Sequence, residues 1–333
     1  MKKLTSGILS LAAVLALVCL ASTTVFAAPV KLKVSMGDPD SHFIVRTMNS
    51  VFKKQIEEQS QGEIIVEVYT GGVLGDYRES LEGLQMGSVE AATVSGTSLT
   101  AFSPKFNCLG LPYLFSDRET LFEAYDGPVG KILFDELPSN GFHGLAFLDN
   151  GFRSISNSRH PVKTPDDVKG LKIRTLESAV AIATWRALGA NPTPISYAEV
   201  YTALQQGVVD AQENPAVNML EIKLHTVQKY YSLTRHQADL DFFVMSRAFY
   251  DKLSPKHQQI VMEAAVAFRD AQRNLFNEEE QKALAKMVAE GLIVNDLTDA
   301  ERKLFQDKLQ PLYTEFRGTV GAELMDLLLS YSK

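Results

Sequence analysis

Apolar and polar positions follow one another along this chain in patterns that predict alternating strands and helices. Residues 30–34 and 63–69 alternate apolar with polar side chains, which is the two-residue period of a half-buried strand. Residues 43–60 carry apolar side chains at helical spacing instead. A second helix over 77–86 and a buried strand over 91–94 complete a β-α-β-α-β order.

The middle of the chain repeats this order with shorter apolar runs, which end on polar side chains. The expected strands are 142–148, 171–174, 191–195 and 208–212, and the expected helices are 178–188 and 197–206. Short apolar runs between helical stretches are typical of an α/β fold. Ligands bind at the C-terminal ends of strands in open α/β sheets, so the polar residues there are candidates for a site.

The last third of the chain predicts two long elements. Residues 230–246 look like a strand in two pieces, at least one of which should cross between lobes. Residues 255–290 keep helical spacing without a breaker, which predicts a helix about 54 Å long. That length exceeds one lobe, so we expect the helix to span both. A coiled-coil arm is the alternative, but alanine-rich faces and the lack of sustained heptads disfavour it.

The beginning of the chain predicts an export signal over residues 1–27. Lys2 and Lys3 precede an apolar core, and Ala27 ends a small-residue cleavage pattern. Cys19 raises the question of a lipid anchor, but the valine before it stands where a lipobox has a small residue, so we expect none. The core is also too short for a stable membrane span. We therefore predict a periplasmic protein.

Charge and cysteine content narrow the function further. The chain of 333 residues has a formal net charge of −7, which becomes −9 when the signal, with two lysines and no acids, is removed. Such a protein is a poor partner for nucleic acid or an anionic membrane. Cys108 is the one cysteine left after cleavage, so no intramolecular disulfide can form. The length predicts about two lobes.

Arg174, at the end of a predicted strand, is the leading candidate for anion binding. Its guanidinium offers a planar pair of donors that matches a carboxylate, which a lysine cannot do. A surface arginine or a structural ion pair explains the spacing equally well.

A second polar group follows the strand predicted over 208–212. Asn214 can cap a helix before Pro215, and a helix N-terminus itself favours an anion. Glu213 is out of place beside an anion, so we expect it to neutralise Arg153. His236 can join this supporting cluster, although a core histidine with satisfied hydrogen bonds is the favoured interpretation.

In the first half of the chain, His42 and Asp76 lie in loops that follow predicted strands. Either can contact a ligand. For each alone, a structural role is favoured: His42 as a cap or packed in a turn, and Asp76 as the N-cap of the helix over 77–86. Ser41 is the expected N-cap of the helix that starts near residue 43.

Several motifs in a fixed order make the chain resemble the periplasmic solute-binding subunit of a tripartite ATP-independent periplasmic (TRAP) transporter, of the DctP-like family. The resemblance covers nearly all of residues 28–333. The motifs are GGVLGD at 71–76, LPYLF at 111–115, GFR at 151–153, GLKIR at 170–174, YAEVYTALQ at 197–205 and VDAQENP at 209–215.

This resemblance implies a two-lobed α/β periplasmic binding protein of type II-like architecture. Each lobe would be a mixed β-sheet flanked by helices, with the long helix spanning both. Lobe I would hold residues 28–150 plus about 240–270, and lobe II residues 151–239 plus about 271–333.

The resemblance also implies roles for particular residues. Arg174 would form the salt bridge to the ligand carboxylate, with Arg153 and Asn214 in the cleft and an aromatic contact from Tyr197. Other cleft residues would be Asp76, Ser95, Thr97 and Glu177. The acid at Glu177, where sialic-acid binders carry an amide, disfavours sialate and suits a hydroxyl-rich ligand.

The predicted function is capture of an organic acid, such as a uronate or another sugar acid, and its delivery to the small and large membrane subunits of the transporter. No cofactor, metal or catalytic residue is expected. A C4-dicarboxylate is the alternative ligand, and a role beside a sensor stays open. A secreted sugar-acid hydrolase or lyase is disfavoured, because the chain has no G-x-S-x-G, H-E-x-x-H or phosphate-loop motif.

Overall fold

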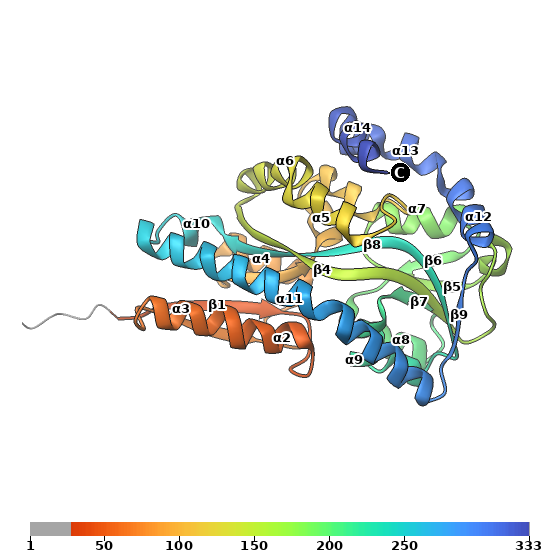
Figure 1. The fold of residues 1–333 in the computed structure, drawn as a ribbon, viewed down its shortest axis with the longest axis horizontal. Helices are drawn as coiled ribbons and strands as arrows, with labels where there is room; N and C mark the ends of the chain where they lie inside the picture. Colours follow the sequence, from red (N-terminus) through yellow and green to blue (C-terminus); the bar gives the residue numbers. More distant parts are fainter. Residues whose placement is uncertain (1–27, 333) are drawn as a thin grey trace, which may run out of the picture.

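The computed structural model describes residues 28–332, and a nine-stranded mixed sheet runs through them (Figure 1). The predicted export signal, residues 1–27, lies outside the described residues. The strands are β1 Val30–Met36, β2 Ile64–Tyr69, β3 Ala91–Ser95, β4 Phe142–Asn157, β5 Lys172–Thr175, β6 Asn191–Pro194, β7 Ala211–Asn214, β8 Tyr230–Ser246 and β9 Ile293–Asp296.

The sheet has the order β2-β1-β3-β8-β4-β7-β5-β6, with β9 paired to β8. Pairing is parallel within β2-β1-β3 and within β7-β5-β6, and β4 and β8 join these two sets by antiparallel pairing. The two long central strands therefore belong to both halves of the molecule. This arrangement of a mixed sheet flanked by helices confirms the predicted fold class.

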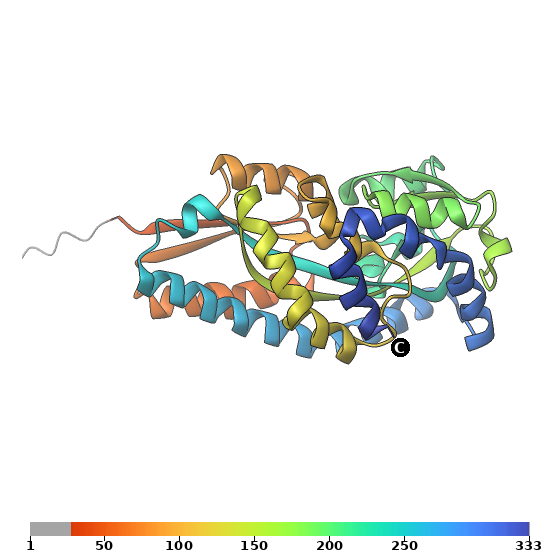
Figure 2. The same ribbon diagram turned by 90° about the horizontal axis from the view of Figure 1, so that it is seen from above.

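Helices cover the sheet and connect its strands (Figures 1 and 2). They are α2 Phe43–Thr47, α3 Lys54–Gln59, α4 Tyr77–Met86, α5 Arg118–Asp126, α6 Pro128–Glu136, α7 Ala179–Ala187, α8 Val200–Gln205, α9 Ala216–Glu221, α10 Arg247–Tyr250, α11 Pro255–Ala289, α12 Asp299–Leu309, α13 Pro311–Val320 and α14 Ala322–Tyr331. A π-helical segment, Met48–Lys53, joins α2 to α3.

Helix α11 is the predicted spine of the molecule, and Figure 1 shows it passing along both halves. It contacts α2 and α3 toward one end of the molecule and α9 toward the other. Phe268 belongs to the apolar core beneath β1, whereas Phe276, two turns later, belongs to a separate core with Phe43 and Val217. One helix thus supplies apolar side chains to two cores, and this ties the halves together.

The C-terminal helices fold back over the molecule (Figure 2). Helix α12 contacts α7, and α14 contacts α5 and α6. The sequence placed residues from about 271 to 333 with lobe II, whereas α5 and α6 fall within lobe I. The lobe boundaries stay a prediction, and the contacts of α14 bear on where that boundary should be drawn.

Four local predictions were wrong. Strand β4 continues to Asn157, nine residues beyond the predicted end, and β8 is one strand rather than two pieces. Helix α2 is capped by His42, whose ring accepts from the amide of Ile44, and not by Ser41. Strand β7 begins at Ala211 and includes Asn214, so Pro215 takes the N-cap position of α9.

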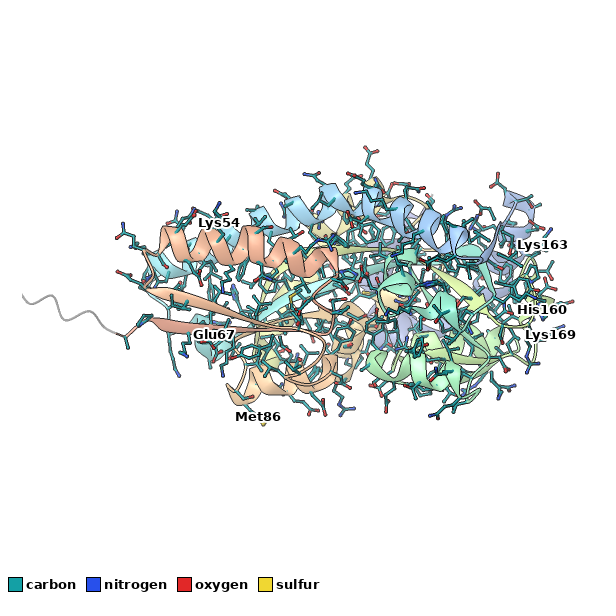
Figure 3. The ribbon with its side chains drawn as sticks, turned by 90° about the horizontal axis from the view of Figure 1, so that it is seen from below. Lys54, Glu67, Met86, His160, Lys163 and Lys169 are labelled. Carbon is teal, nitrogen blue, oxygen red and sulfur yellow. The ribbon has the colours of Figure 1, made fainter. Side chains whose placement is uncertain are left out.

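Exposed lysines are found at both ends of the molecule (Figure 3). Lys54 is toward one end of the molecule, whereas Lys163 and Lys169 are at the other. The buried cations are arginines, and they mark the site described next.

Candidate functional site

A cavity lies where side chains from both halves of the chain meet. It encloses about 500 Å³ of space not filled by atoms, including solvent at its mouth. The lining residues are Asp76, Tyr77, Arg78, Thr97, Ser98, Ala101, Arg174, Leu176, Glu177, Ile195, Ser196 and Tyr197. Of the predicted site residues, Arg174, Tyr197, Glu177, Asp76 and Thr97 therefore share one cavity.

Arg174 reaches this cavity from β5 and is 1 % exposed. Its Nε donates to the carbonyl of Ile195 at 2.8 Å, just beyond the parallel strand β6. Its Nη1 is buried and has no hydrogen-bond partner among residues 28–332. Burial, together with the nearby Arg153 charge, lowers the pKa of Arg174 to about 10. A buried cation with an open donor is suited to binding an anion.

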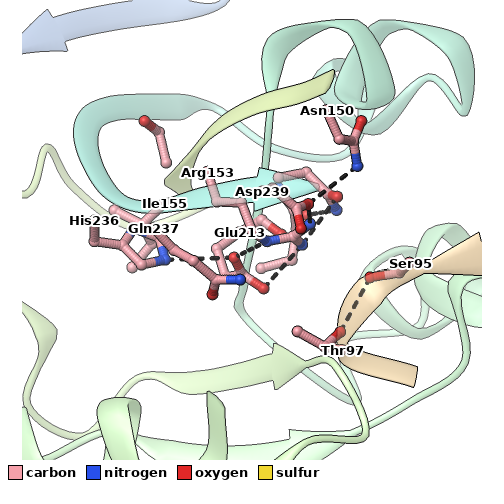
Figure 4. A network of polar contacts seen from close by, with 12 residues as sticks. Ser95, Thr97, Asn150, Arg153, Ile155, Glu213, His236, Gln237 and Asp239 are labelled. Atoms are coloured by element: carbon pink, nitrogen blue, oxygen red, sulfur yellow. Dashed lines mark hydrogen bonds and ion pairs between the residues drawn. The ribbon is translucent and has the colours of Figure 1, made fainter. Parts of the chain in front are cut away.

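Arg153, on β4, is equally buried but has many partners (Figure 4). Its Nη1 lies 2.5 Å from Oδ2 of Asp239, and its Nη2 donates to Oε1 of Glu213 and Oδ1 of Asn214, both at 3.0 Å. Its Nε also donates to Glu213. Burial lowers the pKa of Arg153, but the two carboxylates outweigh this and raise it.

The other predicted members of this cluster face Arg153 or each other. His236 Nε2 lies 3.4 Å from Oε2 of Glu213, and its Nδ1 contacts the hydroxyl of Thr234 at 2.9 Å. Asn214 also donates to Gln212 at 2.6 Å. Burial would raise the pKa of Glu213, but Arg153 and His236 lower it to about 2. Glu213 and His236, the predicted supporting residues, thus lie in one cluster with Arg153. The direct ligand contacts of Arg153 and Asn214 stay predictions.

The predicted residues of lobe I are divided between the cavity and its surroundings. Asp76 caps α4 in a capping box with Glu79, and it also lines the cavity. Thr97 lines the cavity, and its hydroxyl lies 3.0 Å from that of Ser95 (Figure 4). His42 does not line the cavity, and its Nε2 lies 4.0 Å from Oδ1 of Asp38.

Tyr77, at the start of α4, is a lining residue that sequence reasoning missed. Its ring stacks on Tyr197 with centroids 6.2 Å apart and an interplanar angle of 17°, so the two halves touch across the cavity. A Cβ at Gly37 would lie 2.7 Å from Cε1 of Tyr77, so only glycine lets the ring pack there. The available signal was the position of Tyr77 directly after Asp76 in the GGVLGD motif.

Three buried acids beside the site were also missed: Asp38, Asp239 and Asp241. Asn150 donates to Asp239 at 3.0 Å (Figure 4) and to Asp241 at 3.5 Å. Burial, Asp239 and Asp38 raise the pKa of Asp241 well above its ordinary value. The signal in the sequence was two acids at alternate positions, Asp239 and Asp241, directly before the apolar run FFVM at 242–245. Within residues 28–332, no group of three or more His, Cys, Asp or Glu side chains is placed to hold a metal ion.

The fold and this cavity are those expected of a protein that holds a small anionic solute between two halves. The family model for bacterial extracellular solute-binding proteins, family 7 (DctP), matches residues 34–319, and the chain belongs to this family. Its members are the solute-binding subunits of TRAP transporters and not enzymes. The predicted family and the predicted absence of enzymatic activity are therefore both confirmed. In the described part of the chain, no helix is long and apolar enough to cross a membrane.

Named relatives bind more than one kind of acid. The chain is 37 % identical to the 2,3-diketo-L-gulonate-binding periplasmic protein of Escherichia coli, over 78 % of each chain. It is 36 % identical to the C4-dicarboxylate-binding periplasmic protein of Rhodobacter capsulatus, over 82 % of each. The sugar acid binding protein of Advenella mimigardefordensis, solved with galactonate, superposes with a TM-score of 0.88 at 30 % identity, covering 91 % of this chain and 98 % of that one.

Proposed function

We propose that the protein captures an organic acid in the cavity, with the ligand carboxylate bound to Arg174, and delivers it to the membrane subunits of a TRAP transporter. The observation that carries this proposal is the open Nη1 donor of a cation that is 1 % exposed and lines the cavity. Unsatisfied buried donors are uncommon and cost free energy, which a bound carboxylate would recover.

A sugar acid is the ligand class that we propose. Asp76 and Glu177 line the same cavity as Arg174, and ionised carboxylates can only accept hydrogen bonds. Ligand hydroxyl groups would donate to them, whereas a second ligand carboxylate would be repelled. The galactonate complex of the Advenella relative supports this choice.

A C4-dicarboxylate is the second candidate, and one observation favours it. Arg78 lines the cavity from α4, so a second cation faces the space that Arg174 enters. Its Nε is 3.1 Å from Glu82 and its side chain is 62 % exposed, so its charge is both paired and solvated. This weakens it as an anchor relative to Arg174.

Closure of the two lobes around the ligand is part of the proposal. Both halves line the cavity, and Tyr77 and Tyr197 stack across it. A ligand that contacts both sides favours the closed form, because it binds that form more tightly than the open one. The closed form is then the species offered to the membrane subunits. The export signal proposed for residues 1–27 would place this cycle in the periplasm.

A thermal-shift screen of residues 28–333 tests the proposed ligand class. The acids would be glucuronate, galacturonate, gluconate, galactonate, succinate, malate, pyruvate and sialate. A ligand at 100 times its dissociation constant stabilises the folded protein by about 2.7 kcal/mol, which such a screen detects. We expect shifts with uronates or aldonates. Shifts with succinate or malate alone would favour the Arg78 alternative, and no shift with any acid would contradict the proposal.

A further inference from the structure

A second, smaller hollow lies against the cavity that Arg174 enters. It encloses about 240 Å³ of space not filled by atoms, compared with about 500 Å³ for the cavity, and both volumes include solvent at the mouth. Asp76, Tyr77 and Tyr197 line both spaces, so these three residues lie at the boundary between them. The other residues that line the hollow are Gly37, Gly72 and Ala198.

The rings of Tyr77 and Tyr197 close this boundary. Tyr77 begins α4, whereas Tyr197 begins the short 3-10 turn Tyr197–Glu199 that precedes α8. Their ring centroids are 6.2 Å apart and the rings are inclined by 17°. Aromatic side chains in direct contact have centroids about 4.5–7 Å apart, so no part of a ligand fits between these two rings. The pair therefore separates the hollow from the cavity.

Glycines on the far side of the Tyr77 ring leave the hollow open. A Cβ at Gly37 would lie 2.7 Å from Cε1 of Tyr77, so the ring rests directly against the backbone at the end of β1. Gly72 has a φ of +72°, and a Cβ there would meet only the carbonyl oxygen of Gly75, at 3.6 Å. The ring of Tyr77 thus stands between the cavity and space that no side chain of these two positions fills.

Tyr77 and Arg174 lie on opposite sides of the cavity. Tyr77 belongs to α4, which connects β2 to β3, and Arg174 belongs to β5, in the other parallel set of strands. Both line the cavity. A ligand whose carboxylate is bound by Arg174 and which reaches across the cavity therefore directs its other end toward α4.

We propose that Tyr77 is a specificity-determining residue that limits the length of the ligand, because its ring ends the cavity and excludes acids longer than a single sugar unit. This inference rests on the proposed binding of the carboxylate by Arg174. An acid with a further group at the end away from its carboxylate needs the space that the ring occupies. A steric clash with the wrong ligand gives specificity as effectively as a new contact with the right one.

Two pairs of acids, each with one carboxylate, test this inference by isothermal titration calorimetry. Phenyl β-D-glucuronide is glucuronate extended at its anomeric carbon, away from the carboxylate. Lactobionate is gluconate extended by a galactosyl group. We expect the unmodified protein to bind the short acid of at least one pair at least tenfold more tightly than its extended partner.

A series of variants assigns that preference to the ring of Tyr77. Tyr77→Ala joins the hollow to the cavity and should reduce the preference for the short acid at least fivefold. Tyr77→Leu should give a smaller reduction, whereas Tyr77→Phe keeps the ring and should leave the preference within twofold. Circular dichroism and melting temperature check folding, and Tyr77→Leu carries the test if Tyr77→Ala does not fold.

The matched control is Tyr69→Ala. Tyr69 ends β2, lies on the same side of the molecule as α4 and lines neither space, and its hydroxyl donates to Glu67 at 3.1 Å. Its removal takes away an equal side chain, so we expect an unchanged ratio of the two affinities.

The outcomes separate this inference from the proposed function. An extended acid that binds the unmodified protein as tightly as its short partner would overturn the limit on length while leaving Arg174 as the anchor. Equal weakening of both acids by Tyr77→Ala would overturn it too, because the ring would then only contact the ligand or support the fold. The same holds for binding of succinate but of neither short acid. If no acid binds, the proposed function itself fails, and this inference fails with it.

Discussion

Two arginines of this protein, Arg153 and Arg174, are equally buried but have opposite surroundings. Arg153 on β4 is 2 % exposed and Arg174 on β5 is 1 % exposed, and both strands pair with β7. Arg153 contacts Glu213, Asp239 and Asn214. Arg174 makes one hydrogen bond, to a backbone carbonyl, and keeps a buried donor open within residues 28–332.

This difference separates a structural charge from one that is available to a ligand. A buried ion pair is costly to break, because the remaining charge stays desolvated without a partner. A buried cation that lacks a carboxylate already bears that cost in the ligand-free protein, and its pKa is lowered accordingly. Burial alone therefore does not distinguish the proposed binding residue from a structural one. The completeness of its hydrogen bonding does.

The largest expected effect is on ligand binding when Arg174 is removed. Arg174→Ala should raise the dissociation constant for the best acid of the thermal-shift screen at least 100-fold, because two charge-assisted hydrogen bonds contribute about 1.5–3 kcal/mol each. The stability of the ligand-free protein should not fall, since an unpaired buried charge is lost. Calorimetry and urea unfolding measure the two quantities.

The matched control for Arg174 is Arg186→Ala, at the C-terminal end of α7, which removes a cation that does not line the cavity. Its affinity should stay within about twofold of the unmodified protein. Unchanged affinity in Arg174→Ala, with the control behaving as expected, would remove Arg174 as the anchor.

The reverse pattern is expected at Arg153. Arg153→Met leaves Glu213 and Asp239 buried without their cation, so the free energy of unfolding should fall by about 3–5 kcal/mol. Arg247→Met breaks an exposed pair with Asp251 and should cost about 0–1 kcal/mol. Urea unfolding compares the two. Equal losses would mean that the buried network contributes no more than a surface ion pair.

Acid should weaken the Arg153 cluster through Glu213. Its pKa is lowered to about 2 in the folded protein, mainly by Arg153 against the opposing effect of burial, and the ordinary value is 4.5. A depressed carboxyl pKa stabilises the fold above the ordinary pKa, and this contribution, about 3 kcal/mol, is lost as the pH falls from about 4.5 to 2.

Glu213→Gln isolates this contribution from that of Asp239, whose raised pKa acts in the opposite direction. Unfolding free energies measured between pH 6 and pH 3 should decline less steeply in the variant than in the unmodified protein. Parallel curves would show that Glu213 does not titrate in this range with folding.

The sequence predicted the elements with exposed polar side chains well and the element with buried polar side chains poorly. Helix α4 was predicted to the residue and α11 to within one residue, because their surfaces are divided between core and solvent at helical spacing. Strand β4 was cut short at residue 148. Its continuation holds Asp149, Asn150 and Arg153, which are buried in polar contacts and so read as a loop in a hydrophobicity pattern.

A site residue could be predicted when its own side chain suits anion binding. It could not be predicted when its place in the site depends on segments that are distant in the sequence. Arg174 could be proposed from the type of its side chain and its place at a strand end. Asp239 could not, because its contact with Arg153 comes from β4 and β8 lying side by side. The stacking of Tyr77 on Tyr197 likewise joins positions 120 residues apart in the chain.

The smallest expected effect on ligand affinity is that of changing a third arginine, Arg78. It lines the same cavity as Arg174 but is 62 % exposed and paired with Glu82. Because solvent screens exposed charges, Arg78→Gln should change the affinity for a sugar acid less than about threefold. A dicarboxylate held between Arg78 and Arg174 would instead lose at least tenfold, measured with succinate by calorimetry. The three arginines would then differ in one respect each. Arg153 already has its carboxylate partners, Arg174 is buried without one, and Arg78 is too exposed to solvent for its charge to bind a ligand strongly.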